Sequence, residues 1–294
     1  MQTQSNRERQ WTILSLIQWT TSYFKSHLIE NPRADAEILL AHALNLERID
    51  LYLRYDQPLN HGELSRFKIL IKRRIQREPV AYITGTKEFW SLDFRVTTDV
   101  LIPRPETECL VEKAIVGLSG EIPLCILELG TGSGAVTIAL ASEKPNHHYV
   151  ASDRSVFAVR LAGENAKHHK LNRFISFFVG DWFHPLNEDG FFDMIISNPP
   201  YIRTEEIDRL EPEIFQYEPR ISLDGGEDGL RCIEQILVQA HHYLKPKGKL
   251  LLEMGYDQKE KIQGILNSMD CYDNISFFMD YSGYDRGVQL EKKS

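Results

Sequence analysis

Apolar residues in the first quarter of the chain recur at intervals of three and four, which is the spacing of one face of an α-helix. The pattern predicts helices over residues 11–24, Ala34–Leu46 and Leu64–Gln76. The region holds a single glycine and little alternation of β-branched residues. We therefore expect residues 1–79 to form a small all-helical domain.

The pattern changes at residue 80. Residues 80–103 combine Gly85, an alternation of aromatic and polar residues over 88–96, and Pro103 near their end. Alternation with a period of two that is bounded by glycine and proline is typical of paired strands. We expect a β-hairpin linker here, between the helical domain and residues 104–294.

Residues 104–294 alternate short apolar runs with helical stretches. Strands separated by helices predict a parallel sheet that is covered by helices on both faces, so the expected fold is a Rossmann-like α/β domain of seven strands. The expected strands are Cys125–Leu129, Tyr149–Asp153, Ile175–Val179, Met194–Ser197, Lys249–Met254, Ile275–Met279 and a last one near Val288.

Composition narrows the class of protein. The chain has 294 residues, of which 42% are hydrophobic and 26% charged, and this excludes wholesale disorder, a collagen-like repeat and a membrane bundle. Asp and Glu outnumber Lys and Arg by 42 to 34, which gives a formal net charge of −8. An acidic chain is a poor candidate for a general nucleic-acid binder, which usually carries a surplus of Lys and Arg.

The charge is unevenly distributed. Residues 1–90 hold 13 Lys or Arg and 10 Asp or Glu, a net of +3, whereas residues 91–294 hold 21 and 32, a net of −11. The basic excess concentrates between residues 66 and 77, with no acidic residue in between. This stretch is either a solvated helix face or a docking face for an acidic macromolecule.

The cysteines and the N-terminus indicate a compartment. Cys109, Cys125, Cys232 and Cys271 form no Cys-x-x-Cys pair, so we expect reduced thiols and neither a disulfide framework nor a zinc cluster. The first ten residues are polar and charged, unlike a signal peptide, and no run reaches the roughly 18 apolar residues that span a bilayer. We expect a cytoplasmic protein without membrane association.

A glycine-rich loop follows the first predicted strand of the α/β domain. Residues 128–135 read Glu-Leu-Gly-Thr-Gly-Ser-Gly-Ala, and Asp153 ends the next strand, where it can bind ribose hydroxyls. The spacing suits an adenosine-containing cofactor, and it also fits the fingerprint of NAD enzymes. Glu128 would repel a pyrophosphate and no hydride-transfer pair is recognisable, so S-adenosylmethionine (SAM) fits better.

The second motif, Asn198-Pro199-Pro200-Tyr201, follows the apolar strand that ends at Ser197. Two prolines fix two φ angles and remove two N–H donors, so the turn presents a rigid array of acceptors. The Asn198 side-chain oxygen and the Pro199 carbonyl can accept the two N–H bonds of a planar NH₂ group, and Tyr201 can stack on its flat face. Positioning and electrostatics then suffice for methyl transfer to an amide nitrogen, without a strong base.

With these motifs the chain resembles the SAM-dependent methyltransferases, and specifically the HemK/PrmC family of release factor glutamine methyltransferases. The resemblance runs over nearly the whole chain and includes Arg104-Pro105-Glu106-Thr107-Glu108, the glycine loop, Gly180-Asp181-Trp182 and the Asn-Pro-Pro-Tyr turn. It implies methylation of the glutamine amide nitrogen (N5) in the Gly-Gly-Gln motif of class I peptide chain release factors. The helical domain would bind the release factor, and we expect a monomer that binds no nucleic acid stably.

The resemblance also implies the site residues. Trp182 would pack on the adenine, and the segment Arg104-Pro105-Glu106-Thr107-Glu108 would border the same pocket. The residues expected at the SAM site are Gly130, Thr131, Gly132, Ser133, Gly134, Asp153, Trp182 and Asn198. Those expected to hold the glutamine are Asn198, Pro199, Pro200, Tyr201, Arg104 and Glu106, with Asn198, Pro199 and Tyr201 as the catalytic set.

Other classes of protein remain as alternatives. A nucleic-acid adenine-N6 or cytosine-N4 amino-methyltransferase shares the Asn-Pro-Pro-Tyr turn, but it would need a sizeable basic recognition region. A non-catalytic binding protein would retain the fold and lose SAM binding. The histidine pairs 147–148, 168–169 and 241–242 lack carboxylate or cysteine partners at metal spacing, so we expect surface histidines and no metal site.

Overall fold

The computed structural model describes residues 11–120 and 122–294, and the chain divides into two compact units. One unit contains the N-terminal residues up to Gly85 together with Pro212–Tyr217 from much later in the sequence. The other contains Thr86–Glu211 and Glu218–Ser294. The first unit is therefore discontinuous in sequence.

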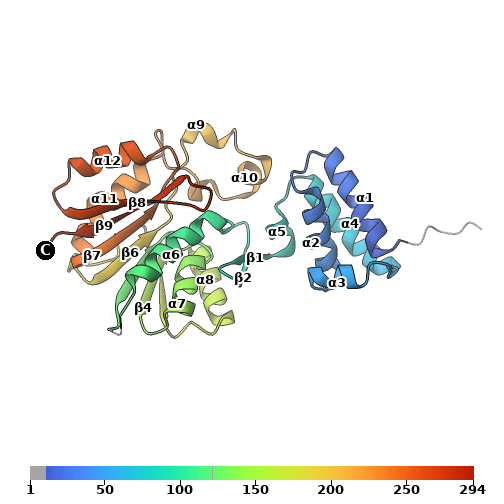
Figure 1. The fold of residues 1–294 in the computed structure, drawn as a ribbon, viewed down its shortest axis with the longest axis horizontal. Helices are drawn as coiled ribbons and strands as arrows, with labels where there is room; N and C mark the ends of the chain where they lie inside the picture. Colours follow the sequence, from blue (N-terminus) through green and yellow to red (C-terminus); the bar gives the residue numbers. More distant parts are fainter. Residues whose placement is uncertain (1–10, 121) are drawn as a thin grey trace, which may run out of the picture. The chain divides into compact units, whose positions relative to one another are not determined.

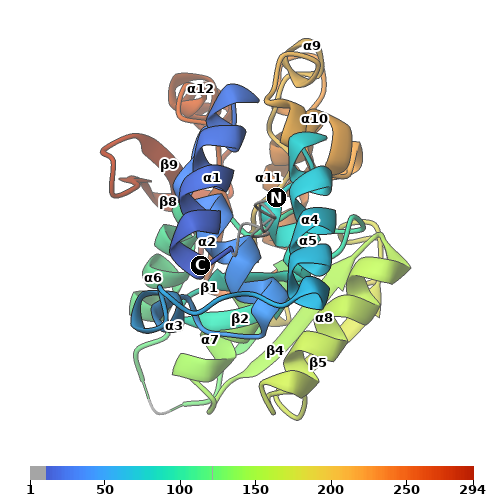
Figure 2. The ribbon, with the colours of Figure 1, turned by 90° about the vertical axis from the view of Figure 1, so that its right-hand side faces the viewer.

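The first unit is helical. Its helices are α1 (Ile13–Ser26), α2 (Pro32–Leu44), α3 (Arg48–Leu53), α4 (His61–Ile75), α5 (Val80–Thr84) and α10 (Pro212–Tyr217). Helix α2 contacts α1, α3, α4 and α5, and α1, α2 and α4 are seen together in Figure 2. Thr12 caps α1 and Asn60 caps α4, each through a capping box that satisfies free N–H groups of the first turn. The helices predicted around residues 11–24, 34–46 and 64–76 are confirmed to within a few residues.

Several residues of the basic stretch 66–77, which begins on α4, form ion pairs within this unit. The buried Arg74 guanidinium binds Asp35 at 2.7 Å and Glu213 at 2.9 Å, and Arg77 binds the other Glu213 oxygen at 2.7 Å. Arg73 binds Glu78 at 2.5 Å. These three arginines help to hold the unit together, and neither interpretation of the stretch applies to the buried Arg74. Arg66, Lys68 and Lys72 are exposed, so for them a solvated face and a docking face both remain predictions.

A β-hairpin begins the second unit and lies within the predicted linker 80–103, but the first residues of that linker form helix α5 (Val80–Thr84) of the helical unit instead. Strands β1 (Thr86–Phe89) and β2 (Leu92–Arg95) pair antiparallel. The two turn residues between them, Trp90 and Ser91, both have positive φ (53° and 56°), as a two-residue type I′ turn requires. The Trp90 N–H donates to Glu108 at 2.8 Å, which helps to hold a conformation that is uncommon for a tryptophan.

The second unit is built on one seven-stranded sheet with the order β5-β4-β3-β6-β7-β9-β8 (Figure 1). Its strands are β3 (Cys125–Leu129), β4 (His148–Asp153), β5 (Ile175–Val179), β6 (Phe192–Ser197), β7 (Leu244–Glu253), β8 (Tyr272–Met279) and β9 (Asp285–Lys292). The predicted Rossmann-like fold with seven strands is confirmed. The expectation of a wholly parallel sheet is wrong for β9, which runs antiparallel to β7 and β8.

Helices cover both faces of this sheet (Figure 1). Those on one face are α6 (Glu108–Gly117), α7 (Ala135–Glu143) and α8 (Val156–His168), and those on the other are α11 (Arg231–Tyr243) and α12 (Lys259–Asn267). Successive residues of a strand point to opposite faces. Ile196 thus packs with α6 and α7, whereas Ile195 packs with α11.

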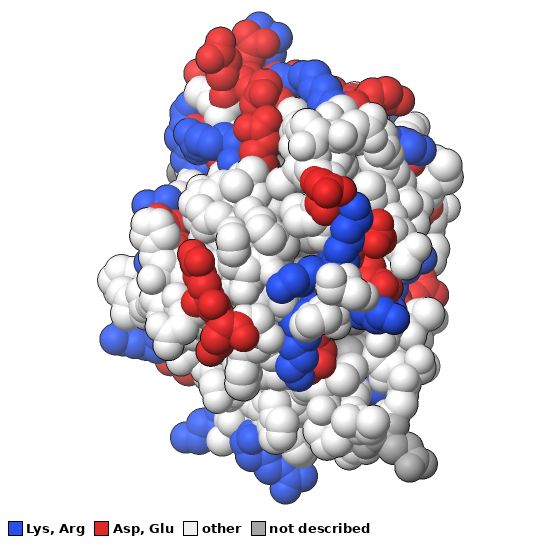
Figure 3. Space-filling view, turned by 90° about the vertical axis from the view of Figure 1, so that its left-hand side faces the viewer, with Lys and Arg blue, Asp and Glu red and all other residues white. Residues whose placement is uncertain are grey.

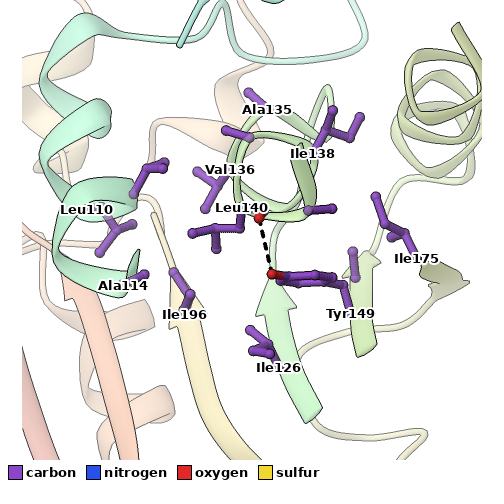
Figure 4. Packing of buried hydrophobic residues seen from close by; sticks show 14 of the residues in the cluster. Leu110, Ala114, Ile126, Ala135, Val136, Ile138, Leu140, Tyr149, Ile175 and Ile196 are labelled. Atoms are coloured by element: carbon purple, nitrogen blue, oxygen red, sulfur yellow. Dashed lines mark hydrogen bonds between the residues drawn. The ribbon is translucent and has the colours of Figure 1, made fainter. Parts of the chain in front are cut away.

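Figure 4 shows the first of these cores, where Leu110 and Ala114 of α6 and the apolar face of α7 lie above the sheet. Tyr149 is fully buried in it, and its hydroxyl donates to the Leu140 carbonyl at 3.1 Å and to the Lys144 carbonyl at 2.9 Å. The tyrosine therefore ties the end of α7 to β4 with its polar atom satisfied.

Charged side chains are mixed on the surface of the second unit. Figure 3 shows acidic and basic groups interspersed with uncharged surface, so the acidic excess of this half does not gather into one patch on that face. The expectation of surface histidines is wrong for His147, which is 2% exposed and accepts the Leu124 N–H at 3.1 Å. None of the described helices combines the length and apolar character needed to span a bilayer.

Candidate active site

A cavity of about 600 Å³ opens in the second unit where β3, β4 and β6 end. In open α/β sheets, ligands bind at the carboxyl ends of the strands, where the strand order reverses. Here the chain proceeds from β3 outward to β4 and β5 and then returns to β6 on the other side of β3. The loops after β3, β4 and β6 carry the glycine motif, Asp153 and Asn198, and all three line the cavity.

The glycine loop turns sharply from β3 into α7. Gly130, Gly132 and Gly134 have φ values of +74°, +54° and +84°, which residues with a Cβ rarely adopt. The Gly130 and Thr131 N–H groups donate to the Ser152 carbonyl at 2.9 and 2.8 Å. These bonds hold the loop against β4. Because its glycines carry no side chain, the loop presents backbone atoms to the cavity.

The Glu128 side chain stabilises the glycine loop through buried hydrogen bonds. Its carboxylate is 4% exposed and accepts the Thr131 hydroxyl at 2.7 Å, the Thr137 N–H at 3.2 Å and the Thr137 hydroxyl. Burial raises the pKa of Glu128 to about 7, against the lowering effect of these donors. The residue therefore joins the loop to the first turn of α7, and it also borders the cavity.

Asp153 connects the glycine loop to the loop after β4. One carboxylate oxygen accepts the Gly132 N–H at 2.9 Å and the other accepts the Ser155 N–H at 2.9 Å. Burial raises the pKa of this carboxyl, and the backbone donors oppose the rise. Each carboxylate oxygen can accept more than one hydrogen bond, so acceptor capacity remains toward the cavity.

Trp182 follows β5 and approaches the glycine loop. Its ring lies 4.0 Å from the point that a Cβ on Gly130 would occupy, and its own φ is +51°. A Cβ on the nearby Gly180 would lie 2.5 Å from Pro185, so only glycine fits there. The loop after β5 thus presents an aromatic face to the cavity beside the glycines.

The Asn-Pro-Pro-Tyr turn continues from β6. The Asn198 side-chain Nδ2 donates to the Thr107 hydroxyl at 3.1 Å, and the Tyr201 hydroxyl donates to Glu253 at 3.2 Å. The Tyr201 carbonyl accepts from Gln258 at 2.9 Å, which anchors the exit of the turn. The turn is therefore rigid at both ends.

Arg104 borders the same cavity from the segment before α6. It forms an ion pair with the buried Glu218 at 2.5 Å, and Glu218 also accepts the Ile102 N–H at 3.3 Å. Burial raises the pKa of Glu218, while the Arg104 charge opposes that rise. Glu106, two residues later, is exposed and is not among the residues that line the cavity.

Most of the residues predicted for the site lie around this one cavity. Gly134 instead precedes α7 as its N-cap, Pro199 is buried, and the Tyr201 hydroxyl points to Glu253. Thr107 belongs to the segment that was predicted to border the pocket, and it lines the cavity, whereas no role was predicted for Glu253. A carboxylate that ends the apolar run Leu250-Leu251-Leu252 at the carboxyl edge of the sheet was the available signal. The predicted residues that line the cavity are Arg104, Gly130, Thr131, Gly132, Ser133, Asp153, Trp182, Asn198 and Pro200.

Family models and solved structures agree on the class of protein. Residues 15–85 match the PrmC N-terminal domain and residues 110–272 match the methyltransferase small domain. A methyltransferase from Pyrococcus furiosus shares the fold with a TM-score of 0.51 and 18% identity, covering 79% of this chain and 99% of that one. The hMettl16 catalytic domain, solved with a MAT2A 3′UTR hairpin, has a TM-score of 0.56 and 13% identity over 73% and 80% of the two chains. The fold and site define a Rossmann-like methyltransferase, a class that implies SAM as the cosubstrate.

Curated relatives narrow the class to one family. The release factor glutamine methyltransferase of Geobacter sulfurreducens is 42% identical over 95% of this chain and 96% of its own length. The enzyme of the same name from Coxiella burnetii is 42% identical over 87% of this chain and 91% of its own length. That of Rhodopirellula baltica is 35% identical over 98% of this chain and 99% of its own length. The chain belongs to the release factor glutamine methyltransferase family, which confirms the family predicted from its motifs.

Proposed function

We propose that this protein transfers a methyl group from SAM to the side-chain amide nitrogen of the glutamine in the Gly-Gly-Gln motif of class I peptide chain release factors. The observation that supports this best is that one cavity joins the glycine loop, Asp153 and the Asn198 turn. A site for an adenosine-containing cosubstrate and a site for a planar amide are thereby adjacent. The names of the near full-length relatives supply the substrate class.

The residues around the cavity fit SAM. The bare backbone of Gly130 and Gly132 would allow its amino-acid portion to approach closely, the Asp153 oxygens would accept its ribose hydroxyls, and Trp182 would pack on its adenine. The loop offers no cluster of cationic side chains for a pyrophosphate, and the buried Glu128 suits a cationic ligand. When bound, SAM supplies a methyl group on a positively charged sulfur.

The Asn198 turn would hold the acceptor amide. The Asn198 side-chain oxygen and the Pro199 carbonyl would accept its two N–H bonds, and Tyr201 would pack against its flat face. Because the adjacent prolines fix the backbone, these acceptors need little reorganisation when the substrate binds. As positive charge develops on the nitrogen, the two oxygens would stabilise its N–H groups. The methylated nitrogen is acidic enough to release one N–H proton to water, so no strong base is required.

The partner in this proposal is a protein. The helical unit would receive the release factor, the enzyme would act as a monomer, and Arg104 and Glu106 would border the bound glutamine loop. Ion pairs occupy Arg73, Arg74 and Arg77, while the other three basic residues of the stretch 66–77 are exposed. Three exposed cations are a small basic surface, which favours a protein substrate over a nucleic acid.

Mass spectrometry tests the proposal. A purified class I release factor is incubated with this protein and SAM, and the Gly-Gly-Gln peptide is fragmented to locate one added methyl. Double-stranded DNA is offered in parallel with labelled SAM. We expect one methyl on the glutamine and none on DNA; methyl transfer to DNA, with an unmodified release factor, would overturn the proposal.

Asn198→Ala gives a sharper test of the site. Removing one of two preorganised acceptors should lower kcat about 10²- to 10³-fold. The affinity for SAM, measured by calorimetry, should change much less. Asn146→Ala, in the exposed loop before β4, is the matched control and should retain wild-type activity. An Asn198→Ala enzyme with the wild-type rate would show that no amide clamp operates.

A further inference from the structure

A buried polar cluster lies beside Asn198, at the start of the Asn-Pro-Pro-Tyr turn, and one of its members, Thr107, also lines the cavity. Thr107 (5% exposed) comes from the short segment before α6, and Glu253 (1% exposed) ends β7. Thr107 accepts from Asn198 at 3.1 Å, and Tyr201 donates to Glu253 Oε1 at 3.2 Å. The Thr107 hydroxyl also faces the Glu253 carboxylate and lowers its pKa as a hydrogen-bond donor does. Three separate segments of the chain thus meet around one carboxylate.

The chemistry of these groups fixes the direction of their hydrogen bonds. Above its pKa of about 7 the Glu253 carboxylate is ionised and can only accept, so it then draws the hydroxyl hydrogens of Thr107 and Tyr201 toward itself. With its hydrogen so committed, the Thr107 oxygen can serve Asn198 only as an acceptor. The group of Asn198 that faces Thr107 must then be the NH₂, and the carboxamide oxygen must face the opposite way.

We propose that Glu253 and Thr107 are positioning residues, which hold the Asn198 carboxamide with its oxygen toward the cavity so that it can accept an N–H of the substrate amide. The inference rests on the proposed function for the meaning of that orientation. If the Asn198 carboxamide were flipped, its NH₂ would face the NH₂ of the substrate amide. Two donors would then meet, and the turn would repel the substrate. The cluster thus selects one of two nearly isosteric orientations of Asn198.

The surroundings of Glu253 agree with this role. Tyr201 donates to Oε1, and the buried Oε2 is taken up by no other donor among the described residues, so it is available to the Thr107 hydrogen. Burial raises the pKa of Glu253 to about 7, which makes its charge sensitive to its neighbours. The titratable or charged groups that act on it or are acted on by it are Arg286, Tyr201, Glu106 and Cys109.

Matched substitutions separate positioning from a general structural role. Thr107→Val keeps the shape of the side chain and removes its hydroxyl, whereas Thr107→Ser retains a hydroxyl. We expect Thr107→Val to lower kcat about tenfold or more, and Thr107→Ser to stay near wild type. The affinity for SAM should remain unchanged in both variants, because Thr107 does not belong to the glycine loop. Glu253→Gln, which introduces an NH₂ donor into the cluster, should resemble Thr107→Val.

A double-mutant cycle and a spectrum complete the test. If Thr107 acts through Asn198, adding Thr107→Val to Asn198→Ala should lower kcat no further. In ¹⁵N-labelled wild-type protein, the Asn198 side-chain NH₂ pair, identified by its loss in Asn198→Ala, should be shifted by Thr107→Val and unaffected by Thr107→Ser. Additive losses of kcat, or an NH₂ pair that ignores Thr107→Val, would overturn the positioning role.

The spectrum needs no substrate, so the two proposals can fail separately. A wild-type protein that leaves release factor unmethylated, while its Asn198 signal depends on Thr107, would refute the function alone. Methylation of release factor together with an additive cycle would refute the positioning role alone.

Discussion

Replacing Glu128 with glutamine should remove one source of pH-dependent stability in the α/β unit. The Glu128 carboxyl is buried against Thr131 and Thr137, and burial raises its pKa from 4.5 to about 7. The folded protein therefore holds a proton more tightly at this site than the unfolded chain does. Stability contributed by this group is fully present below pH 4.5 and is lost as the pH rises through 7.

The magnitude follows from the size of that shift. Each pKa unit corresponds to about 1.4 kcal/mol, so between pH 5.5 and 8 the wild-type unit should lose about 2 kcal/mol of unfolding free energy through Glu128 alone. Glutamine resembles the protonated carboxyl in shape, and its side-chain oxygen can still accept from Thr131 and Thr137. The Glu128→Gln variant should lose about 2 kcal/mol less over the same pH range.

The protein is unfolded with urea at pH 5.5 and at pH 8, and unfolding is monitored by hydrogen exchange of peptides from β3 and β6. These peptides report the stability of the α/β unit apart from that of the helical unit. Glu234→Gln removes an exposed carboxyl of α11 and is the control, which should follow the wild-type pH profile. If Glu128→Gln loses as much stability as wild type between these pH values, Glu128 is already ionised in the fold and the reasoning is wrong.

Two further substitutions test the packing that supports the site. Glu213→Ala should destabilise the helical unit by about 3 kcal/mol in urea unfolding, because the buried Arg74 loses one of its two carboxylate partners; an unchanged midpoint would mean that the α10 contact adds no stability. Tyr149→Phe should cost the α/β unit about 1 kcal/mol in the same assay, since the Leu140 and Lys144 carbonyls lose the tyrosine hydroxyl while each keeps a backbone N–H donor. A variant as stable as wild type would contradict that assignment.

The sequence predicts the α/β fold well because each of its signals is local. Near-continuous apolar runs along β3 and β6 mark strands that are buried on both faces, and the glycines and prolines mark the turns that follow these strands. The antiparallel β9 also had a local signal, since the connection over residues 280–284 is too short for the crossover that parallel strands need. The short connection therefore predicts an antiparallel pair at this point, although strands and helices alternate over most of the unit.

Other features depend on partners that are distant in sequence. The burial of Arg74 follows from Glu213, 139 residues away, and that of His147 from the Leu124 N–H. The contact between Thr107 and Asn198 likewise joins positions 91 residues apart. Composition and spacing identify such residue types, but only the folded chain shows which of them meet.

The placement of α10 affects how the protein can be divided for experiments. A fragment that ends at Gly85 carries Arg74 and Arg77 but lacks Glu213, and it also lacks the Tyr217 hydroxyl that donates to the Gln76 carbonyl at 2.8 Å. In such a fragment Arg77 would lose its carboxylate partner, and the Arg74 guanidinium would keep Asp35 as its one remaining carboxylate partner in these ion pairs. Isolating the helical unit intact would require grafting Pro212–Tyr217 onto it through a new connection, and the remaining chain would need a short bridge from Glu211 to Glu218.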